Sequence, residues 1–124
     1  AGGVDMALLK YDRSGNLLWG RSVGAPNSTD VPHGIATDAQ GNIYVTGYFG
    51  QDGGPARSVD FDPGPGVTLL STQSGFDAFL AKYDSGGGFL WARGFGNTAA
   101  NTEERAWDLA VEPATGAVFF TGAF

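Results

Sequence analysis

Short hydrophobic runs alternate with polar turn sequences along the whole chain. Residues 43–46 (Ile-Tyr-Val-Thr) and 118–121 (Val-Phe-Phe-Thr) are rich in β-branched and aromatic side chains and lack the three-and-four spacing of a helix. In residues 17–23 the bulkier side chains fall mainly on one side of an extended segment, and residues 89–95 repeat that division. This pattern predicts β-strands.

The polar sequences between these runs predict tight hairpin turns. Residues 12–16 (Asp-Arg-Ser-Gly-Asn) and 38–42 (Asp-Ala-Gln-Gly-Asn) contain Gly and Asn, which tolerate the positive φ of such turns. Residues 84–88 and 112–116 stand at matching places. The 21 glycines and 6 prolines argue against helices. We therefore expect an all-β fold.

The chain matches itself at a nearly constant shift. A unit that is copied at a fixed period cannot bury both of its faces alone, so neighbours of the same kind must cover them. The shift grows slightly between matching strings, where loops tolerate insertions. The matching strings are residues 5–12 and 77–84, 18–19 and 90–91, 35–36 and 109–110, and 46–47 and 121–122, at shifts of 72, 72, 74 and 75.

Composition narrows the class of protein. Hydrophobic residues make up 42% and aromatic residues 13%, which is too much for a disordered tail. Without cysteine there is no disulfide framework and no thiolate metal site. No apolar run is long enough to insert into a membrane, and no leader opens the sequence. The formal charge of −6 argues against a nucleic-acid partner.

The order of the matching strings resembles the bacterial SBBP repeat, the β-propeller repeat. The strings that carry the resemblance are residues 77–84, 89–92, 34–38 and 41–47 (Gly-Asn-Ile-Tyr-Val-Thr-Gly), and residues 59–66 are similar to a linker that often separates such repeats. The resemblance covers nearly the whole chain. It implies four-stranded propeller blades in a bacterial protein that is secreted or on the cell surface. It implies no catalytic residues.

A propeller blade has four antiparallel strands, the first innermost and the fourth at the rim. We interpret residues 1–124 as a single repeat array with about two blades' worth of strands. The complete blade is expected over residues 34–94, with strands at 34–38, 43–49, 76–84 and 89–94 and a long insertion at 50–75; residues 4–23 and 107–124 are expected to be half-blades.

Each half-blade leaves an edge of unpaired backbone groups. We expect the chain either to close into a homo-oligomeric ring, in which three or four chains give six or eight blades, or to continue into further blades of a longer chain. Pairing of the two half-blades within a monomer would leave blade faces exposed to water. In this register the short turns share one side of the disc, and the long connections share the other, where propellers usually bind their ligands.

Four residues on the long-connection side are candidate ligand contacts: His33, Trp107, Asp30 and Glu103. His33 is the only histidine, and it aligns with Trp107, just before an innermost strand near the predicted channel mouth. A difference at matched positions suits a specialised surface, and it also suits neutral drift in a loop. Glu103 fits either an acidic rim or an ordinary solvated loop.

Asp60 and Asp62 are the candidate metal ligands, since two carboxylates two residues apart can hold a calcium ion together with backbone carbonyls. The alternative is that they cap the turn before Pro63. No other cofactor is expected. Trp19 and Trp91 occupy the same place in each repeat, which favours packing between blades over a ligand platform.

Three hypotheses for function follow. The first is a non-enzymatic binding module that presents aromatic and acidic groups of the long-connection face to a glycan or a protein. The second is a purely structural, self-assembling repeat. The third is a lyase or hydrolase with its site at the channel mouth, although the sequence offers few convergent titratable groups for one.

Overall fold

The computed structural model describes residues 3–97 and 103–124, and this part of the chain contains strands and no helix, hence none that could cross a membrane. The all-β prediction is confirmed. The strands are β1 (Met6–Tyr11), β2 (Leu17–Val23), β3 (Val31–Thr37), β4 (Ile43–Pro55), β5 (Ser58–Asp60), β6 (Leu69–Ser71), β7 (Ser74–Tyr83), β8 (Phe89–Phe95), β9 (Arg105–Val111) and β10 (Val118–Ala123).

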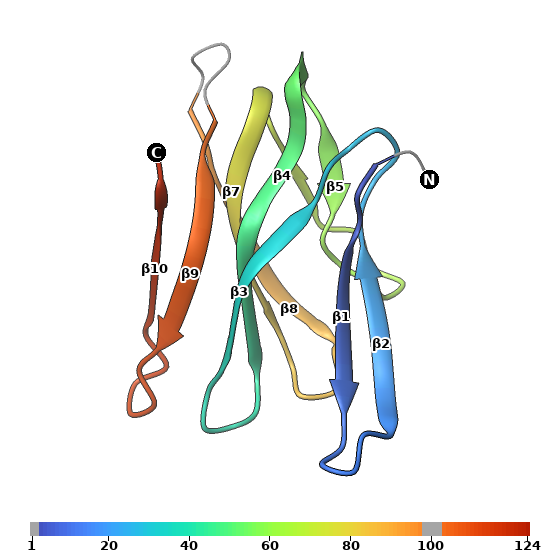
Figure 1. The fold of residues 1–124 in the computed structure, drawn as a ribbon, viewed down its shortest axis with the longest axis vertical. Coiled ribbons are helices and arrows are strands. Elements are labelled where there is room, and N and C mark those ends of the chain that lie inside the picture. The colour runs from blue at the N-terminus through green and yellow to red at the C-terminus, as the bar shows by residue number, and fades with distance from the viewer. Residues whose placement is uncertain (1–2, 98–102) are drawn as a thin grey trace.

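A four-stranded antiparallel sheet, in the order β3-β4-β7-β8, occupies the centre of the molecule (Figure 1). Its strands follow the order that the sequence predicts for a blade. Two separate hairpins, β1-β2 and β9-β10, lie on either side of this sheet (Figure 1). The central sheet and these two hairpins form three layers, and the described strands do not close into a ring.

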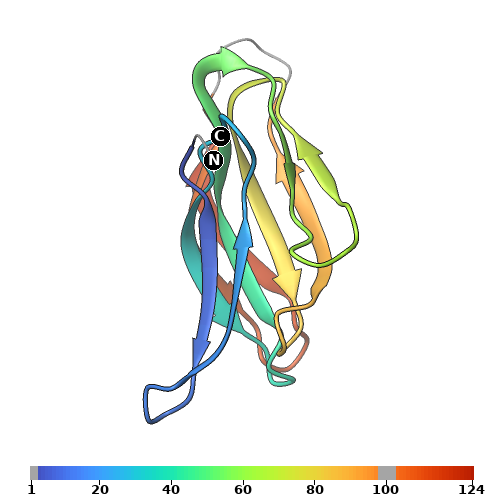
Figure 2. The ribbon, with the colours of Figure 1, turned by 90° about the vertical axis from the view of Figure 1, so that its right-hand side faces the viewer.

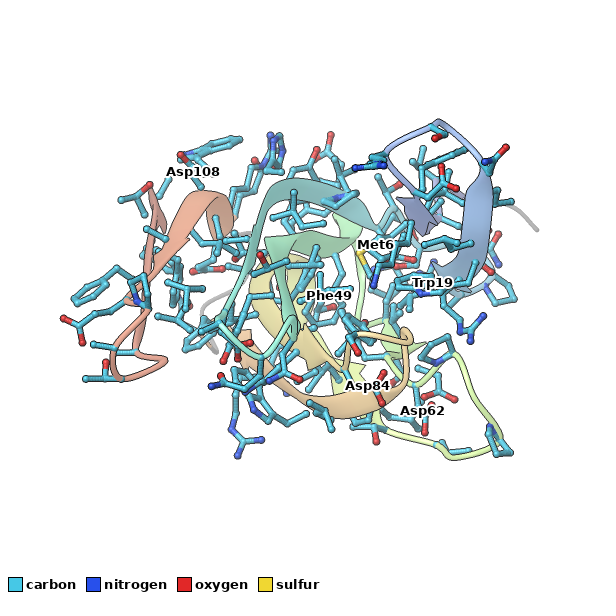
Figure 3. All side chains as sticks on the ribbon, turned by 90° about the horizontal axis from the view of Figure 1, so that it is seen from below. Met6, Trp19, Phe49, Asp62, Asp84 and Asp108 are labelled. Carbon is cyan, nitrogen blue, oxygen red and sulfur yellow. The ribbon has the colours of Figure 1, made fainter. Side chains whose placement is uncertain are left out.

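The central sheet is buried on both faces. Along β4, Ile43 and Val45 belong to the core cluster shared with the β1-β2 hairpin, whereas Tyr44 belongs to the cluster shared with β9-β10. Figure 3 shows Met6 and Trp19 on the side of their hairpin that faces the central sheet, with Phe49 in the interior. Trp19 packs on the first cluster and Trp91 on the second, so both have the packing role predicted for them.

The short turns share one end of the molecule, as predicted (Figure 1). In the turns that begin at Asp12, Asp38 and Asp84, the carboxylate accepts backbone hydrogen bonds from the residues two and four positions later. A glycine with φ between 80° and 84° completes each of these three turns. The hydrogen bonds lower the pKa of Asp12, mainly through the Asn16 side chain.

The insertion at 50–75 is more structured than a long connection. β4 continues to Pro55, and β5 and β6 form a hairpin that lies beside β8 (Figure 2). Val59 and Phe61 are buried in the first core cluster, and Phe61 lies 4.9 Å from Phe79 between ring centroids. The sequence feature that indicates this burial is the alternation Val-Asp-Phe-Asp at residues 59–62. In an extended segment this alternation turns the two apolar side chains to the same side, here the inside.

Candidate functional site

Aromatic rings from three strands of the central sheet and from β9 form a continuous row at the long-connection end, which we call the aromatic row. His33 of β3 meets Trp107 of β9 edge to face, with ring centroids 5.0 Å apart and an angle of 77° between the planes. On its other side His33 lies 5.4 Å from Tyr48, and Tyr48 lies 4.9 Å from Phe76. The row joins the central sheet to β9.

Arg105 lies over the buried end of the aromatic row, which is formed by Tyr48 and Phe76. Its guanidinium lies 4.8 Å from the ring centroid of Tyr48 and 5.1 Å from that of Phe76, within the range of cation–π attraction. The same guanidinium donates to Glu103 at 2.7 Å. Glu103 is therefore linked to the aromatic row through Arg105.

Exposure increases along the row. Phe76 is buried and Tyr48 half-buried, whereas His33 and Trp107 are exposed, Trp107 to 44%. An approaching molecule can thus reach one imidazole and one indole held in fixed contact. Such a surface offers an apolar platform with two N–H groups for hydrogen bonding.

His33 and Trp107 are displaced by the same backbone feature. In the pairing of β3 with β4, Pro32 faces Gly47 and Gly34 faces Thr46, so His33 is the extra, unpaired residue of a β-bulge. In the pairing of β9 with β10, Asp108 faces Thr121 and Ala106 faces Gly122, so Trp107 is the extra residue. Sequence reasoning missed both bulges, although the Thr-Gly string in each repeat was visible.

Asp30 lies apart from the aromatic row. It is 1% exposed, and its carboxylate accepts hydrogen bonds from the Ser28 hydroxyl at 2.7 Å and from the Ala25 amide at 3.3 Å. Burial raises the pKa of Asp30 to about 6, against the lowering effect of these hydrogen bonds and with a further contribution from the charge of Asp5. The structure thus brings together three of the four candidate residues, two by contact and Glu103 through Arg105.

Asp60 and Asp62 hold backbone amides of the insertion. Asp60 accepts from the amides of Asp62 at 3.1 Å and Thr68 at 2.8 Å, and Asp62 accepts from the Gly64 amide at 2.7 Å. This is the turn-capping arrangement. No group of three potential metal-ligating side chains (His, Cys, Asp or Glu) occurs within residues 3–97 and 103–124, and metal binding by these two carboxylates stays a prediction.

Comparison with known proteins assigns the repeat. Residues 18–48 match the family model SBBP, described as a β-propeller repeat. The chain carries an SBBP repeat. The matched span contains β2, β3 and β4 as far as Tyr48, and therefore also the His33 bulge. The matched span thus runs from the β1-β2 hairpin into the first two strands of the central sheet.

The chain is also similar in sequence to a curated protein. The chain is 35% identical over 91 residues to the uncharacterized WD repeat-containing protein L264 of Acanthamoeba polyphaga mimivirus. The matched region covers 73% of this chain and 6% of that much longer relative. The SBBP repeat therefore occurs here in a chain that is similar to one small part of a WD repeat protein.

Proposed function

We propose that this chain is a non-enzymatic interaction module built from β-propeller blades, which binds a protein partner through the exposed end of the aromatic row. The observation that carries this proposal is the edge-to-face contact of His33 with Trp107, each held by a β-bulge. Bulges that recur at matched positions are typical of sites where a side chain is re-aimed for function. Repeat folds of this kind commonly act by presenting loops to partners.

The chemistry of this surface suits a peptide segment. An exposed indole is a frequent anchor in protein interfaces because it buries a large apolar area and keeps one hydrogen-bond donor. The Glu103–Arg105 pair at the other end of the row adds two charges that can select a partner. A glycan that stacks on Trp107 remains the alternative ligand.

Two binding screens on the purified chain test the proposal. Peptides selected from a display library on the native protein should lose at least tenfold in affinity for Trp107→Ala and for His33→Ala, measured by titration calorimetry. Leu90→Ala is the matched control, because Leu90 is exposed to a similar extent (47%) but lies on the rim strand β8. Retained peptide affinity in Trp107→Ala would contradict the proposal, and binding on a glycan array alone would assign the row to carbohydrates.

A specific observation also favours self-assembly. β1 and β10 are each paired on one edge within the described residues, and their sheets lie on opposite sides of the central sheet (Figure 1). β10 occupies the place of β4 in the next repeat, and β1 occupies the place of β7 in the previous one. Because β4 and β7 are neighbours in the central sheet, β10 of one copy suits β1 of a second copy.

The central sheet supplies a register for that pairing. Val45 faces Ala81 in the β4-β7 ladder, and the equivalent residues in β10 and β1 are Phe120 and Leu9. An apolar groove of about 200 Å³ between residues 6–8 and 32–35 runs beside β1, where the incoming strand would lie. The proposed assembly is a ring of three or four copies, which gives six or eight blades.

Light scattering and disulfide trapping test the assembly. The native chain should have the mass of three or four copies, and Leu9→Cys with Phe120→Cys in one chain should oxidise to covalent rings. Lys10→Cys with Phe120→Cys is the control, because adjacent residues of a strand point to opposite faces. A monomeric mass at all concentrations would exclude assembly by this chain alone, and equal trapping in both pairs would exclude the register.

The enzyme alternative has weaker support, because the described titratable groups do not converge on the aromatic row beyond His33, Glu103 and Arg105. A bacterial secreted or cell-surface location stays a prediction, testable by fractionation of cells that express the full-length protein.

A further inference from the structure

Two acidic pairs occupy equivalent positions, one at each junction between consecutive blades. In each pair the backbone amide of the second acidic residue donates to the carbonyl just before the first one, at 2.6 Å in the earlier pair and 2.9 Å in the later pair. This parallel bridge brings the two carboxyl groups within electrostatic reach of each other. The pairs are Asp5 with Asp30, and Asp77 with Glu104.

The two pairs differ in how their oxygens are used. In the earlier pair Asp5 is exposed and both oxygens of Asp30 accept hydrogen bonds. In the later pair Asp77 is 6% exposed and Glu104 is 3% exposed, and both are more than nine-tenths buried. Oδ1 of Asp77 and Oε2 of Glu104 are buried without a hydrogen-bond partner. Two adjacent buried carboxylates with open oxygens are unfavourable unless something neutralises them.

The neighbouring cation, Arg105, forms no ion pair with either carboxylate, and its own Nε is buried without a hydrogen-bond partner. Arg105 follows Glu104 in β9, but its guanidinium lies over the Tyr48 and Phe76 rings and pairs with Glu103. Neither Asp77 nor Glu104 forms an ion pair with any residue in the ranges 3–97 and 103–124. The later pair therefore carries uncompensated negative charge at the blade junction.

A cavity with a mixed polar and apolar lining opens at Asp77. Its volume is about 320 Å³, and Ser71, Gln73, Asp77 and Asn97 contribute polar side chains to its lining. Asn97 also donates its amide to Oε1 of Glu104 at 2.6 Å and leaves the other carboxylate oxygen open. A Cβ at Gly96 would stand 2.2 Å from the Asp77 carboxyl carbon, so this glycine lets the carboxylate lie against the backbone.

We propose that Asp77 and Glu104 bind a divalent cation, Ca²⁺, at the junction between the complete blade and the following half-blade. Calcium prefers carboxylate, amide and hydroxyl oxygens and accepts irregular sets of six to eight ligands that include water. The two open oxygens supply the charge, and Ser71 and Gln73, which line the cavity at Asp77, supply neutral oxygen ligands. Because Asp77 is on β7 and Glu104 immediately precedes β9, the ion ties two blades together.

Protons compete with the cation for this pair. Burial, with a further contribution from the Glu104 charge, raises the pKa of Asp77 to about 6. Since Ca²⁺ requires ionised carboxylates, its binding releases protons near that pH and weakens as the solution becomes more acidic. This proposal goes beyond partner binding, and it neither requires nor excludes a ligand on the aromatic row.

Calorimetric titration of the chelator-treated native chain with CaCl₂ tests the proposal. We expect one ion per chain at pH 7.5, proton release at pH 6, and a melting temperature raised by about 5–10 °C at a hundredfold excess over Kd. Asp77→Asn and Glu104→Gln should each weaken binding at least tenfold. Asp30→Asn, from the earlier pair, and Asp60→Asn, from the insertion, are the controls and should bind as the native chain does.

The outcomes separate the alternatives. Absence of heat and of any thermal shift at millimolar CaCl₂ would overturn the proposal, and the pair would then share a proton instead. Loss of binding in Asp60→Asn with retention in Asp77→Asn would move the site to the insertion. The calcium titration and the thermal shift are measured on the native chain, so the proposal stays testable even where a variant folds poorly.

Discussion

Gly47 lies so close to Val31 that a Cβ at position 47 would stand 2.0 Å from the Val31 carbonyl oxygen. This approach lies at the His33 bulge, where Pro32 faces Gly47 and Gly34 faces Thr46. The second bulge repeats the relationship: a Cβ at Gly122 would stand 2.3 Å from the Arg105 carbonyl oxygen. The glycine of each Thr-Gly string is therefore part of the feature that displaces His33 or Trp107.

Replacing Gly47 by alanine should strain the bulge. Because the obstructing atom is backbone, β3 must shift, and we expect a loss of about 1–3 kcal/mol in the free energy of unfolding. Urea denaturation measures it. Gly94→Ala is the control, since its Cβ would meet no atom closer than 3.8 Å. Equal stability of the two variants would show that the bulge is not rigid.

Removal of the Phe61 ring should destabilise the whole fold. Phe61 is 1% exposed and lies 5.5 Å from Phe49 between centroids, so Phe61→Ala should lower the free energy of unfolding by about 3–5 kcal/mol. Val67→Ala, at a side chain that is 72% exposed in the same insertion, should change it by less than about 0.5 kcal/mol. A small effect of Phe61→Ala would mean that the insertion is a dispensable loop.

Stability should fall as pH rises through the pKa of Asp30. This pKa is raised to about 6 in the folded state from the ordinary 3.8, mainly by burial, so the folded state binds the proton more tightly than the unfolded state does. The proton therefore stabilises the fold fully below about pH 4, and this stabilisation is lost as pH rises to 6 and above.

Urea unfolding between pH 4 and pH 7.5 measures this dependence. Asp30→Asn should remove part of the pH dependence of the free energy of unfolding. The pH dependence that remains should come from Asp77, whose pKa is also raised to about 6. Calcium must be chelated during the measurement. A profile that Asp30→Asn leaves unchanged would contradict the assignment.

Thr46 and Thr121 should respond differently to removal of the hydroxyl. Thr46 is fully buried, and its hydroxyl donates to the Phe79 carbonyl at 2.5 Å, so Thr46→Val should lower the free energy of unfolding by about 1–2 kcal/mol. Thr121 occupies the same place in β10 but is exposed. Thr121→Val should therefore leave the free energy of unfolding of the monomer unchanged at low protein concentration.

Assembly should change the response at Thr121. If a second copy covers β10 in the register proposed above, Thr121→Val should weaken the ring, which sedimentation at several protein concentrations detects. A ring that is insensitive to Thr121→Val would argue against that register.

Local chemistry explains what the sequence predicts well. The alternation of Ile43, Tyr44 and Val45 identifies a strand with two buried faces, because each side chain is directed by its own position in the pleat. The turn at Asp12 is equally local, since its hydrogen bonds join residues at most four positions apart. The fold of each hairpin and the existence of the repeat follow from such features.

The sequence by itself determined the strands outside residues 50–75, the short turns, the repeat and the order of the four strands in the central sheet. Only the tertiary structure decided that His33 and Trp107 leave their ladders as bulges, that Phe61 enters the core, and that Asp77 and Glu104 meet at a blade junction. The physical reason is distance along the chain: a bulge or a carboxylate pair depends on how two remote segments align, and that alignment is a property of the packed sheets.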